Sequence, residues 1–311
     1  MPIKMLKPKF WLRKNAILSY IFFPFAFSLQ ILINLNKLIT KQKEFKIPII
    51  CIGNIFVGGT GKTPLTIFLA DELKKINKKP AIIKKFYSNH KDEHSLIKEK
   101  SNSLFLGKNR LEAIHEAENA KCDLAILDDG FQDFSIKKDL NILCFNSKQL
   151  IGNGMTIPSG PLREKMSAVK RADIVIINGE KNKSFEEHIN NISEKIQIFY
   201  SNYVATNIDK LKNKKLFAFA GIGNPENFFD LLIKSNLEVE KKVFYSDHYN
   251  YTKNELKKII KFSSENNLQP VTTEKDYHRI KHFGFNNIFY LQIKLEIFKK
   301  DKFLKKINNY L

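Results

Sequence analysis

Residues 47–70 read IPIICIGNIFVGGTGKTPLTIFLA. The apolar, β-branched beginning of this segment predicts a buried strand, and its apolar end predicts a helix. Between them lies GGTGKT, a glycine-rich turn of the kind that binds phosphate groups. In such a turn, backbone N–H groups and the N-terminus of the following helix bind the anion together. The segment therefore predicts a phosphate-binding loop between a strand and a helix.

Six consecutive residues form the predicted nucleotide site. The glycines let the backbone curl around a phosphate, the lysine can reach the β and γ phosphates, and the second threonine can bind magnesium. The loop departs from the strict pattern G-x-x-x-x-G-K-[ST], because Phe56 occupies the position of the first glycine. The six candidates are Gly58, Gly59, Thr60, Gly61, Lys62 and Thr63.

A second motif follows the apolar run at residues 122–127, which predicts another buried strand. Asp128 and Asp129 come directly after this run. An acidic pair at the carboxyl end of a strand holds magnesium in nucleotide-binding proteins, directly or through water. Together with Thr63, the two aspartates are the predicted Mg²⁺ ligands. The sequence lacks the guanine-reading pattern N-K-x-D, so ATP is the expected nucleotide.

Strand-like and helix-like segments alternate from residue 47 to residue 177. This alternation predicts a P-loop NTPase-like α/β fold, with a mostly parallel sheet and helices on both faces. Ligands of such sheets bind at the carboxyl ends of the strands. Residues 86–99 suggest a polar loop, and residues 180–210 a polar crossing to a second unit. We expect an N-terminal basic segment with an amphipathic helix at 1–45, a P-loop core domain at 46–210 and a smaller α/β domain at 211–311.

The chain is strongly basic, with 52 Lys and Arg against 32 Asp and Glu and a formal net charge of +20. This surplus predicts an anionic partner, such as nucleic acid, an acidic membrane surface or a phosphorylated substrate. A nucleic-acid-binding module would concentrate basic and aromatic residues on one face, whereas the lysines here are spread along the chain. Such a module would also leave the phosphate loop unexplained, so we expect no nucleic-acid partner.

Residues 15–36 carry no charge and follow a basic segment. This uncharged segment is long enough for a transmembrane helix. However, Pro24 interrupts it, both flanks are basic, and five polar residues fall in one sector of a helical projection. An interfacial helix on an acidic membrane fits better than a span or a helix packed on the protein's own core. A signal peptide is not expected, because an ATP site just downstream belongs in the cytoplasm. The polar stripe comprises Asn15, Ser19, Gln30, Asn34 and Lys37.

Seven motifs occur in the order and spacing of tetraacyldisaccharide 4'-kinases, the lipid A 4'-kinases of Gram-negative bacteria, and the chain resembles this family over roughly residues 10–290. The resemblance implies transfer of the γ-phosphate of ATP to the 4'-hydroxyl of a tetraacylated glucosamine disaccharide 1-phosphate. It also implies a peripheral protein, expected to be a monomer, at the cytoplasmic face of the inner membrane, with an N-terminal helix that helps reach the lipid. The motifs are GNIFVGGTGKTP (53–64), LDDGFQD (127–133), IPSGPLRE (157–164), RADIVIINGE (171–180), AGIGNPENFF (220–229), SDHYNYT (246–252) and VTTEKD (271–276).

The resemblance also assigns roles to residues. It implies that Asp92 acts with His248 as the pair that activates the acceptor, one from each domain, so that closure of a cleft would assemble them. Arg163 matches an arginine of the family and is expected to contact a phosphate or a sugar. Two departures stand out: Lys84-Lys85-Phe86-Tyr87 replaces the family's S-R-G-Y, and Asp133 replaces the histidine of D-D-G-x-Q-H.

One alternative function is a deviant-loop ATPase of the partitioning or metal-chaperone type, in which hydrolysis switches dimers. Those proteins usually place a second lysine just before the glycines of the loop. That position is Val57 in this chain, which favours the kinase.

Overall fold

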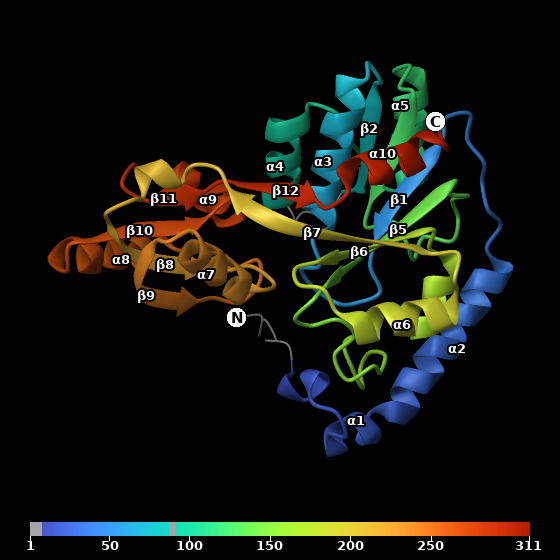
Figure 1. Cartoon of the computed structure of the whole chain (residues 1–311), viewed down its shortest axis with the longest axis horizontal. Coiled ribbons are helices and arrows are strands. Elements are labelled where there is room, and N and C mark those ends of the chain that lie inside the picture. Colours follow the sequence, from blue (N-terminus) through green and yellow to red (C-terminus); the bar gives the residue numbers. More distant parts are fainter. Residues whose placement is uncertain (1–7, 87–90) are drawn as a thin grey trace. The chain divides into compact units, whose positions relative to one another are not determined.

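The computed structural model describes residues 8–86 and 91–311 (Figure 1). Their contacts divide the chain into two compact units. The larger unit contains residues 8–86, 101–202 and 296–311, and the smaller contains residues 91–100 and 203–295. The sequence-based boundary lay instead at 210/211, and it assigned residues 91–100 to the core domain and residues 296–311 to the smaller one.

An eight-stranded sheet forms the centre of the larger unit, in the order β12-β7-β6-β5-β1-β4-β2-β3. Every pair from β7 to β3 is parallel. Strands such as β1 are buried at every position, as expected for a parallel sheet that is covered on both faces. The strands are β1 Ile49–Gly53, β2 Pro80–Lys85, β3 Leu104–Gly107, β4 Leu124–Asp128, β5 Leu140–Asn146, β6 Ile174–Asn178, β7 Gln197–Ala205 and β12 Ile293–Ile297.

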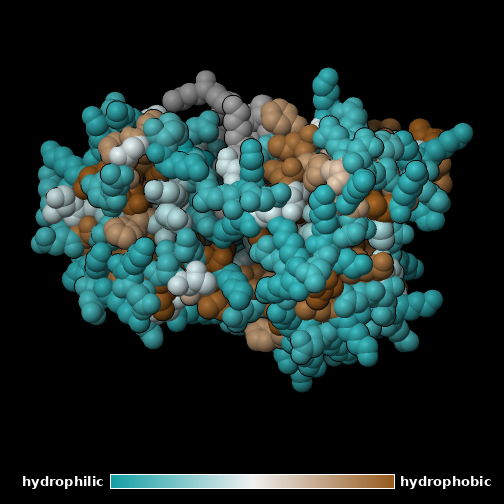
Figure 2. Space-filling model, turned by 90° about the horizontal axis from the view of Figure 1, so that it is seen from above, coloured by the Kyte–Doolittle hydropathy of each residue, from teal (hydrophilic) through white to brown (hydrophobic). Residues whose placement is uncertain are grey.

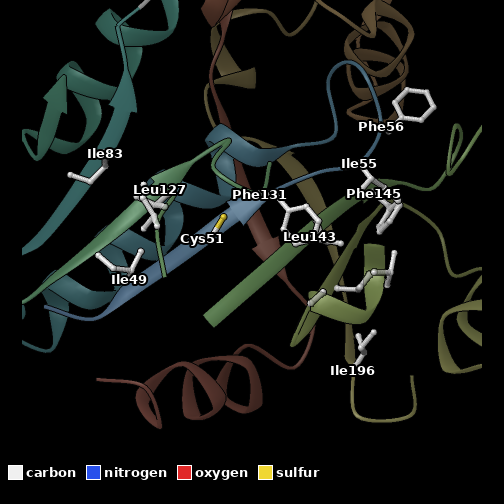
Figure 3. Packing of buried hydrophobic residues seen from close by; sticks show 14 of the residues in the cluster. Ile49, Cys51, Ile55, Phe56, Ile83, Leu127, Phe131, Leu143, Phe145 and Ile196 are labelled. Carbon is white, nitrogen blue, oxygen red and sulfur yellow. The ribbon is translucent and has the colours of Figure 1, made fainter. Parts of the chain in front are cut away.

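Helices cover both faces of this sheet. Cys51 of β1 belongs to a buried cluster, part of which Figure 3 shows. The same cluster contains Ile114 of α5 and Ile189 of α6. The neighbouring side chain of Ile52 points to the opposite face, because successive residues of a strand alternate. On that face α3 and α10 are joined by an ion pair of 2.7 Å between Lys300 and Glu72. The predicted P-loop NTPase-like fold is confirmed. The helices are α3 Lys62–Lys75, α5 Arg110–Asn119, α6 Lys183–Ile192 and α10 Lys300–Asn308, with the 3₁₀ helix η3 Met166–Arg171.

The smaller unit has its own parallel sheet, in the order β11-β10-β8-β9. Ala218 of β8 packs in a cluster with Phe229 of α7, and the adjacent Phe219 packs in another cluster with Leu256 of α8. Helices therefore lie on both faces here too. The elements are β8 Lys215–Ala220, β9 Glu238–Phe244, β10 Leu268–Thr273, β11 Phe289–Leu291, α4 Lys91–Ser101, α7 Pro225–Lys234, α8 Lys253–Glu265 and α9 Glu274–Ile280, with the 3₁₀ helices η4 Ile208–Lys210 and η5 Lys281–Phe283.

Two segments differ from the sequence-based expectation. The predicted crossing at 180–210 contains β7, whose Tyr200 is buried beside β6. The predicted loop at 86–99 contains α4, which contacts α9. The two helices stabilise each other through an ion pair of 2.6 Å between Lys100 and Glu274. Among the described side chains of α4 the apolar Ile97 is fully buried, so its packing and the tertiary contacts fix a helix that could not be recognised from its polar sequence.

The N-terminal segment comprises the 3₁₀ helix η1 Lys9–Leu12 and the helices α1 Ile17–Ile21 and α2 Phe23–Ile39. Part of the predicted polar stripe faces the protein: Asn153 donates a hydrogen bond of 2.9 Å to the Ser19 hydroxyl, and Gln30 donates one of 3.2 Å to the Arg163 carbonyl. No helix in the described ranges is long and apolar enough to cross a membrane. Large apolar side chains are exposed along the segment, among them Leu12, Ile17, Leu18, Tyr20, Ile21, Phe22, Phe23, Phe25, Phe27, Leu29, Ile31, Leu32, Leu35, Leu38 and Ile39.

The surface reflects the basic composition. On the face seen in Figure 2, hydrophilic residues predominate and hydrophobic residues lie scattered between them. Such scattered apolar residues are usual for a protein surface, whereas a continuous run of exposed ones indicates an interaction site. Between Leu12 and Ile39, exposed large apolar side chains are concentrated, with exposed polar residues such as Ser28 and Asn34 among them, which indicates an interaction site.

Candidate active site

The phosphate loop connects β1 to α3 at the edge of the sheet where the strands end. Gly58 and Gly61 have φ values of 124° and 96°, which an L side chain rarely adopts. Gly61 is the N-cap of α3, so Lys62 and Thr63 occupy the first turn of the helix. This arrangement directs backbone N–H groups toward a bound anion. The structure thus places the loop residues where the sequence predicted them.

Two residues that precede the glycines stabilise the loop. The buried amide of Asn54 donates hydrogen bonds to the Phe56 carbonyl at 2.5 Å and to the Thr60 hydroxyl at 3.0 Å. Phe56 is fully buried in the core cluster (Figure 3). A phenylalanine can therefore replace the usual first glycine, because the side chain at this position packs in the core. The sequence analysis missed the role of Asn54, although the residue follows directly after the strand.

The acidic pair lies at the end of β4, which is the neighbour of β1 in the sheet. Thr63 donates a hydrogen bond of 3.1 Å from Oγ1 to Oδ2 of Asp128. Lys62 Nζ lies 3.7 Å from Asp129 Oδ1, and Arg163 donates to the same oxygen at 2.8 Å. Burial raises the pKa of the Asp129 carboxyl, but the charges of Lys62 and Arg163 outweigh burial and hold this pKa below its usual value. Five predicted site residues therefore meet at one place.

Asp128 has a second oxygen with a different environment. Its Oδ1 is buried and has no hydrogen-bond partner among the residues that the structure describes. Buried carboxylate oxygens are normally satisfied, and an orphaned one next to a phosphate loop fits a site for a hydrated cation. The donor set, a threonine hydroxyl and two carboxylates, is the set of oxygen ligands that Mg²⁺ prefers.

Arg163 belongs to a loop, here called the 153–163 loop, which approaches the phosphate loop from the side. Arg163 donates its backbone N–H to the Ile55 carbonyl at 2.6 Å, and Val57 donates to the Pro161 carbonyl at 2.8 Å. These bonds hold the guanidinium of Arg163 against Asp129. The loop is in turn bound to the N-terminal segment through Ser19 and Gln30, as described above.

Asp133 replaces the family's histidine, and the structure gives this carboxylate partners of its own. Arg110 donates to Asp133 Oδ2 at 3.2 Å and to the Asp129 carbonyl at 2.7 Å. Ser135 donates its hydroxyl to Asp133 Oδ1 at 2.6 Å. Asp133 and Arg110 therefore fix the turn that carries Asp129, whose φ is 62°.

His248 lies in the smaller unit, in a network of its own. The imidazole contacts Arg279 through Nδ1 and Lys275 through Nε2, each at 3.3 Å. Arg279 donates to the Gly221 carbonyl at 2.7 Å and to the buried Asp276 at 2.6 Å. His248 itself has a φ of 55°, and its backbone N–H donates to Gly221 at 3.1 Å. The side chain is thus held in a defined place by several polar contacts.

Asp92 is in the first turn of α4, and its side chain lies outside the described part of the structure. The contacts group α4 with the smaller unit, which also contains His248. The sequence-based expectation instead placed the two residues in different domains. The difference comes from the missed helix, because a loop after β2 would have stayed with the core, whereas α4 pairs with α9.

A phosphate loop and an acidic strand end at one edge of a parallel sheet define a P-loop NTPase-like protein. Within this class, the chain belongs to the tetraacyldisaccharide-1-P 4'-kinase family, whose model matches residues 17–311.

Relatives in two genera support this membership. A tetraacyldisaccharide 4'-kinase of Pelagibacter ubique is 40% identical over 301 residues, which cover 95% of each chain. One of Rickettsia bellii is 34% identical over 324 aligned residues, which cover 98% of each chain. Among solved structures, LpxK from Aquifex aeolicus, described as an "apo" form in complex with ATP, matches with a TM-score of 0.71 at 24% identity, covering 94% of this chain and 99% of that one. That likeness supports the fold.

Proposed function

We propose that this chain transfers the γ-phosphate of ATP to the 4'-hydroxyl of a tetraacyldisaccharide 1-phosphate, a step of lipid A synthesis in a Gram-negative bacterium. The observation that carries the proposal is the hydrogen bond between Thr63 and Asp128, which joins the phosphate loop to the acidic strand end. Family membership selects the acceptor, because the relatives bear the name of this kinase. The proposed enzyme acts as a monomer.

In this proposal the loop from Gly58 to Thr63 binds the phosphates of ATP, and Lys62 neutralises the β and γ groups. Thr63, Asp128 and Asp129 hold Mg²⁺, which when bound offsets the negative charge of the phosphates. Arg163 contacts the transferred phosphate or the acceptor sugar through its guanidinium, which also donates to Asp129 and Gln132.

Asp92 is the proposed general base, which removes the proton of the 4'-hydroxyl as the phosphate is transferred. His248 orients or assists this carboxylate. The contacts of His248 with Arg279 and Lys275 support a positioned rather than a mobile imidazole. Both residues belong to the smaller unit, whereas the phosphate loop belongs to the larger one.

We propose further that the N-terminal segment lies on the cytoplasmic face of the inner membrane. Its polar residues Ser19 and Gln30 bond to the protein, and large apolar side chains make up much of its exposed surface, together with exposed polar residues such as Asn34 and Lys37. An open cavity beside these apolar side chains is lined by Lys9, Arg13 and Lys14, which suit the headgroups of anionic lipids. A lipid acceptor could be taken up there without leaving the membrane.

The test is transfer of labelled γ-phosphate from ATP to tetraacyldisaccharide 1-phosphate in mixed micelles. Asp92→Asn is expected to lose about 100- to 10,000-fold in rate, the usual contribution of a general base. Glu93→Gln, next to it in α4, is the matched control and should retain most activity. ATP hydrolysis without a lipid product would favour the switch-type ATPase, and full activity of Asp92→Asn would assign the base elsewhere.

A further inference from the structure

Lys84 is a buried lysine at the end of β2, the strand beside β4. Its side chain is 7% exposed, and its Nζ lies 2.6 Å from Asp128 Oδ2. Taking an ammonium group out of water is unfavourable unless it gains strong partners. We therefore expect the ammonium group of Lys84 to affect the properties of the Asp128 carboxylate that it contacts.

The contact makes the two oxygens of Asp128 unequal. Oδ2 accepts hydrogen bonds from both Lys84 and Thr63, whereas the buried Oδ1 has no partner among the residues described. A cation that binds to Asp128 therefore binds a carboxylate whose Oδ2 already accepts two hydrogen bonds. Mg²⁺ has to share Asp128 with Lys84 or displace its ammonium group.

The charges of the site lead to the same expectation. Lys62, Lys84 and Arg163 contact Asp128 and Asp129, so among the ion pairs of the described residues three positive groups contact these two carboxylates. A positive surplus attracts nucleotide phosphates and repels a divalent cation, and both effects are large at short range in a partly buried site.

We propose that Lys84 is a built-in counter-ion of Asp128 that lets the site bind nucleotide before the metal and raises the Mg²⁺ concentration that the site requires. This inference rests on the proposed function, since it assumes that the loop binds ATP. It goes beyond that function because it assigns to Lys84, at a position where the family has serine, a role in metal dependence. A merely structural ion pair would affect stability and leave the preference for metal unchanged.

The experiment measures two binding equilibria without turnover. A fluorescent, non-hydrolysable ATP analogue is titrated into the full chain in EDTA, and Mn²⁺ is then titrated into the nucleotide complex and followed by electron paramagnetic resonance. The variants are Lys84→Met and Lys84→Gln, which remove the charge, and Lys84→Arg, which keeps it. Glutamine can still donate a hydrogen bond to Asp128, so Lys84→Gln replaces Lys84→Met in the experiment if the methionine variant does not fold. Lys85→Met is the matched control, because it removes a charge on the opposite face of β2.

Removal of the Lys84 charge is expected to weaken metal-free nucleotide binding by about tenfold or more and to tighten Mn²⁺ binding by a similar factor. Lys84→Arg should stay within about threefold of the wild type in both titrations, and Lys85→Met should leave Mn²⁺ binding unchanged. Unchanged affinities in both charge-removing variants would overturn the inference while the proposed function stands. A wild-type chain that binds no nucleotide would overturn both.

Discussion

The exposed apolar side of α2 offers a quantitative test of membrane binding. Phe25 is 67% exposed and Leu32 is 62% exposed. Complete burial of such a side chain contributes about 1.5–3 kcal/mol, so two-thirds of it contributes about 1–2 kcal/mol per residue. The double variant Phe25→Ser, Leu32→Ser should therefore lose about 2–4 kcal/mol of partitioning free energy. That loss equals a decrease in the partition coefficient of about 30- to 1,000-fold.

The assay is sedimentation with vesicles that contain anionic lipid, over a range of lipid concentrations. The control is the double variant Ile233→Ser, Phe298→Ser, which removes two exposed apolar side chains of 47% and 52% exposure outside the N-terminal segment. The control should bind vesicles like the wild type. Equal binding by the α2 variant and the wild type, or an equal loss in the control, would refute the argument from α2. Circular dichroism confirms that each variant is folded.

Three further predictions concern the larger unit. Arg171→Met removes the 2.6 Å charge partner of the buried Glu164, which keeps a hydrogen bond from Gln132, and should lower the free energy of unfolding by about 1–3 kcal/mol, measured as a fall of several degrees in Tm. Burial raises the pKa of the Asp133 carboxyl, but hydrogen bonds from Ser135 and other contacts hold it below its usual value. Asp133→Asn should therefore lose stability at pH 7, above the unfolded-state pKa of about 4, and urea unfolding should show this difference shrinking as the pH falls through the lower folded-state pKa. Burial raises the pKa of Cys144 to about 12, so its thiol should resist a thiol reagent at pH 8 and react only in denaturant.

The core of the fold could be predicted from the sequence because its strands are continuous apolar runs. The run before the phosphate loop became β1, and the run before Asp128 became β4. The polar helix α4 could not be predicted in this way, since it has a single fully buried residue, Ile97, among its described side chains and depends on ion pairs with α9. Local pattern therefore identified elements that bury their own surface and missed one that depends on a partner distant in sequence.

The candidate site shows the same division. Lys62, Thr63 and Asp128 could be predicted because the loop and the strand end are local motifs. The role of Lys84 could not be predicted, because nothing in the sequence brings β2 beside β4. A helical projection shows the polar stripe, but it does not show that Ser19 and Gln30 bond to the protein itself.

The 153–163 loop is bound on two sides, and this has a practical consequence for handling the protein. Trp11 donates from its ring to the Pro158 carbonyl at 3.0 Å, and Gln30 bonds to the carbonyl of Arg163, whose own N–H is bound to Ile55 ahead of the glycines. Deletion of the apolar N-terminal segment to improve solubility would therefore remove hydrogen bonds to the backbone that supports the phosphate loop. A detergent micelle or lipid nanodisc that covers the intact N-terminal segment would keep these hydrogen bonds and also prevent aggregation through the exposed apolar side chains.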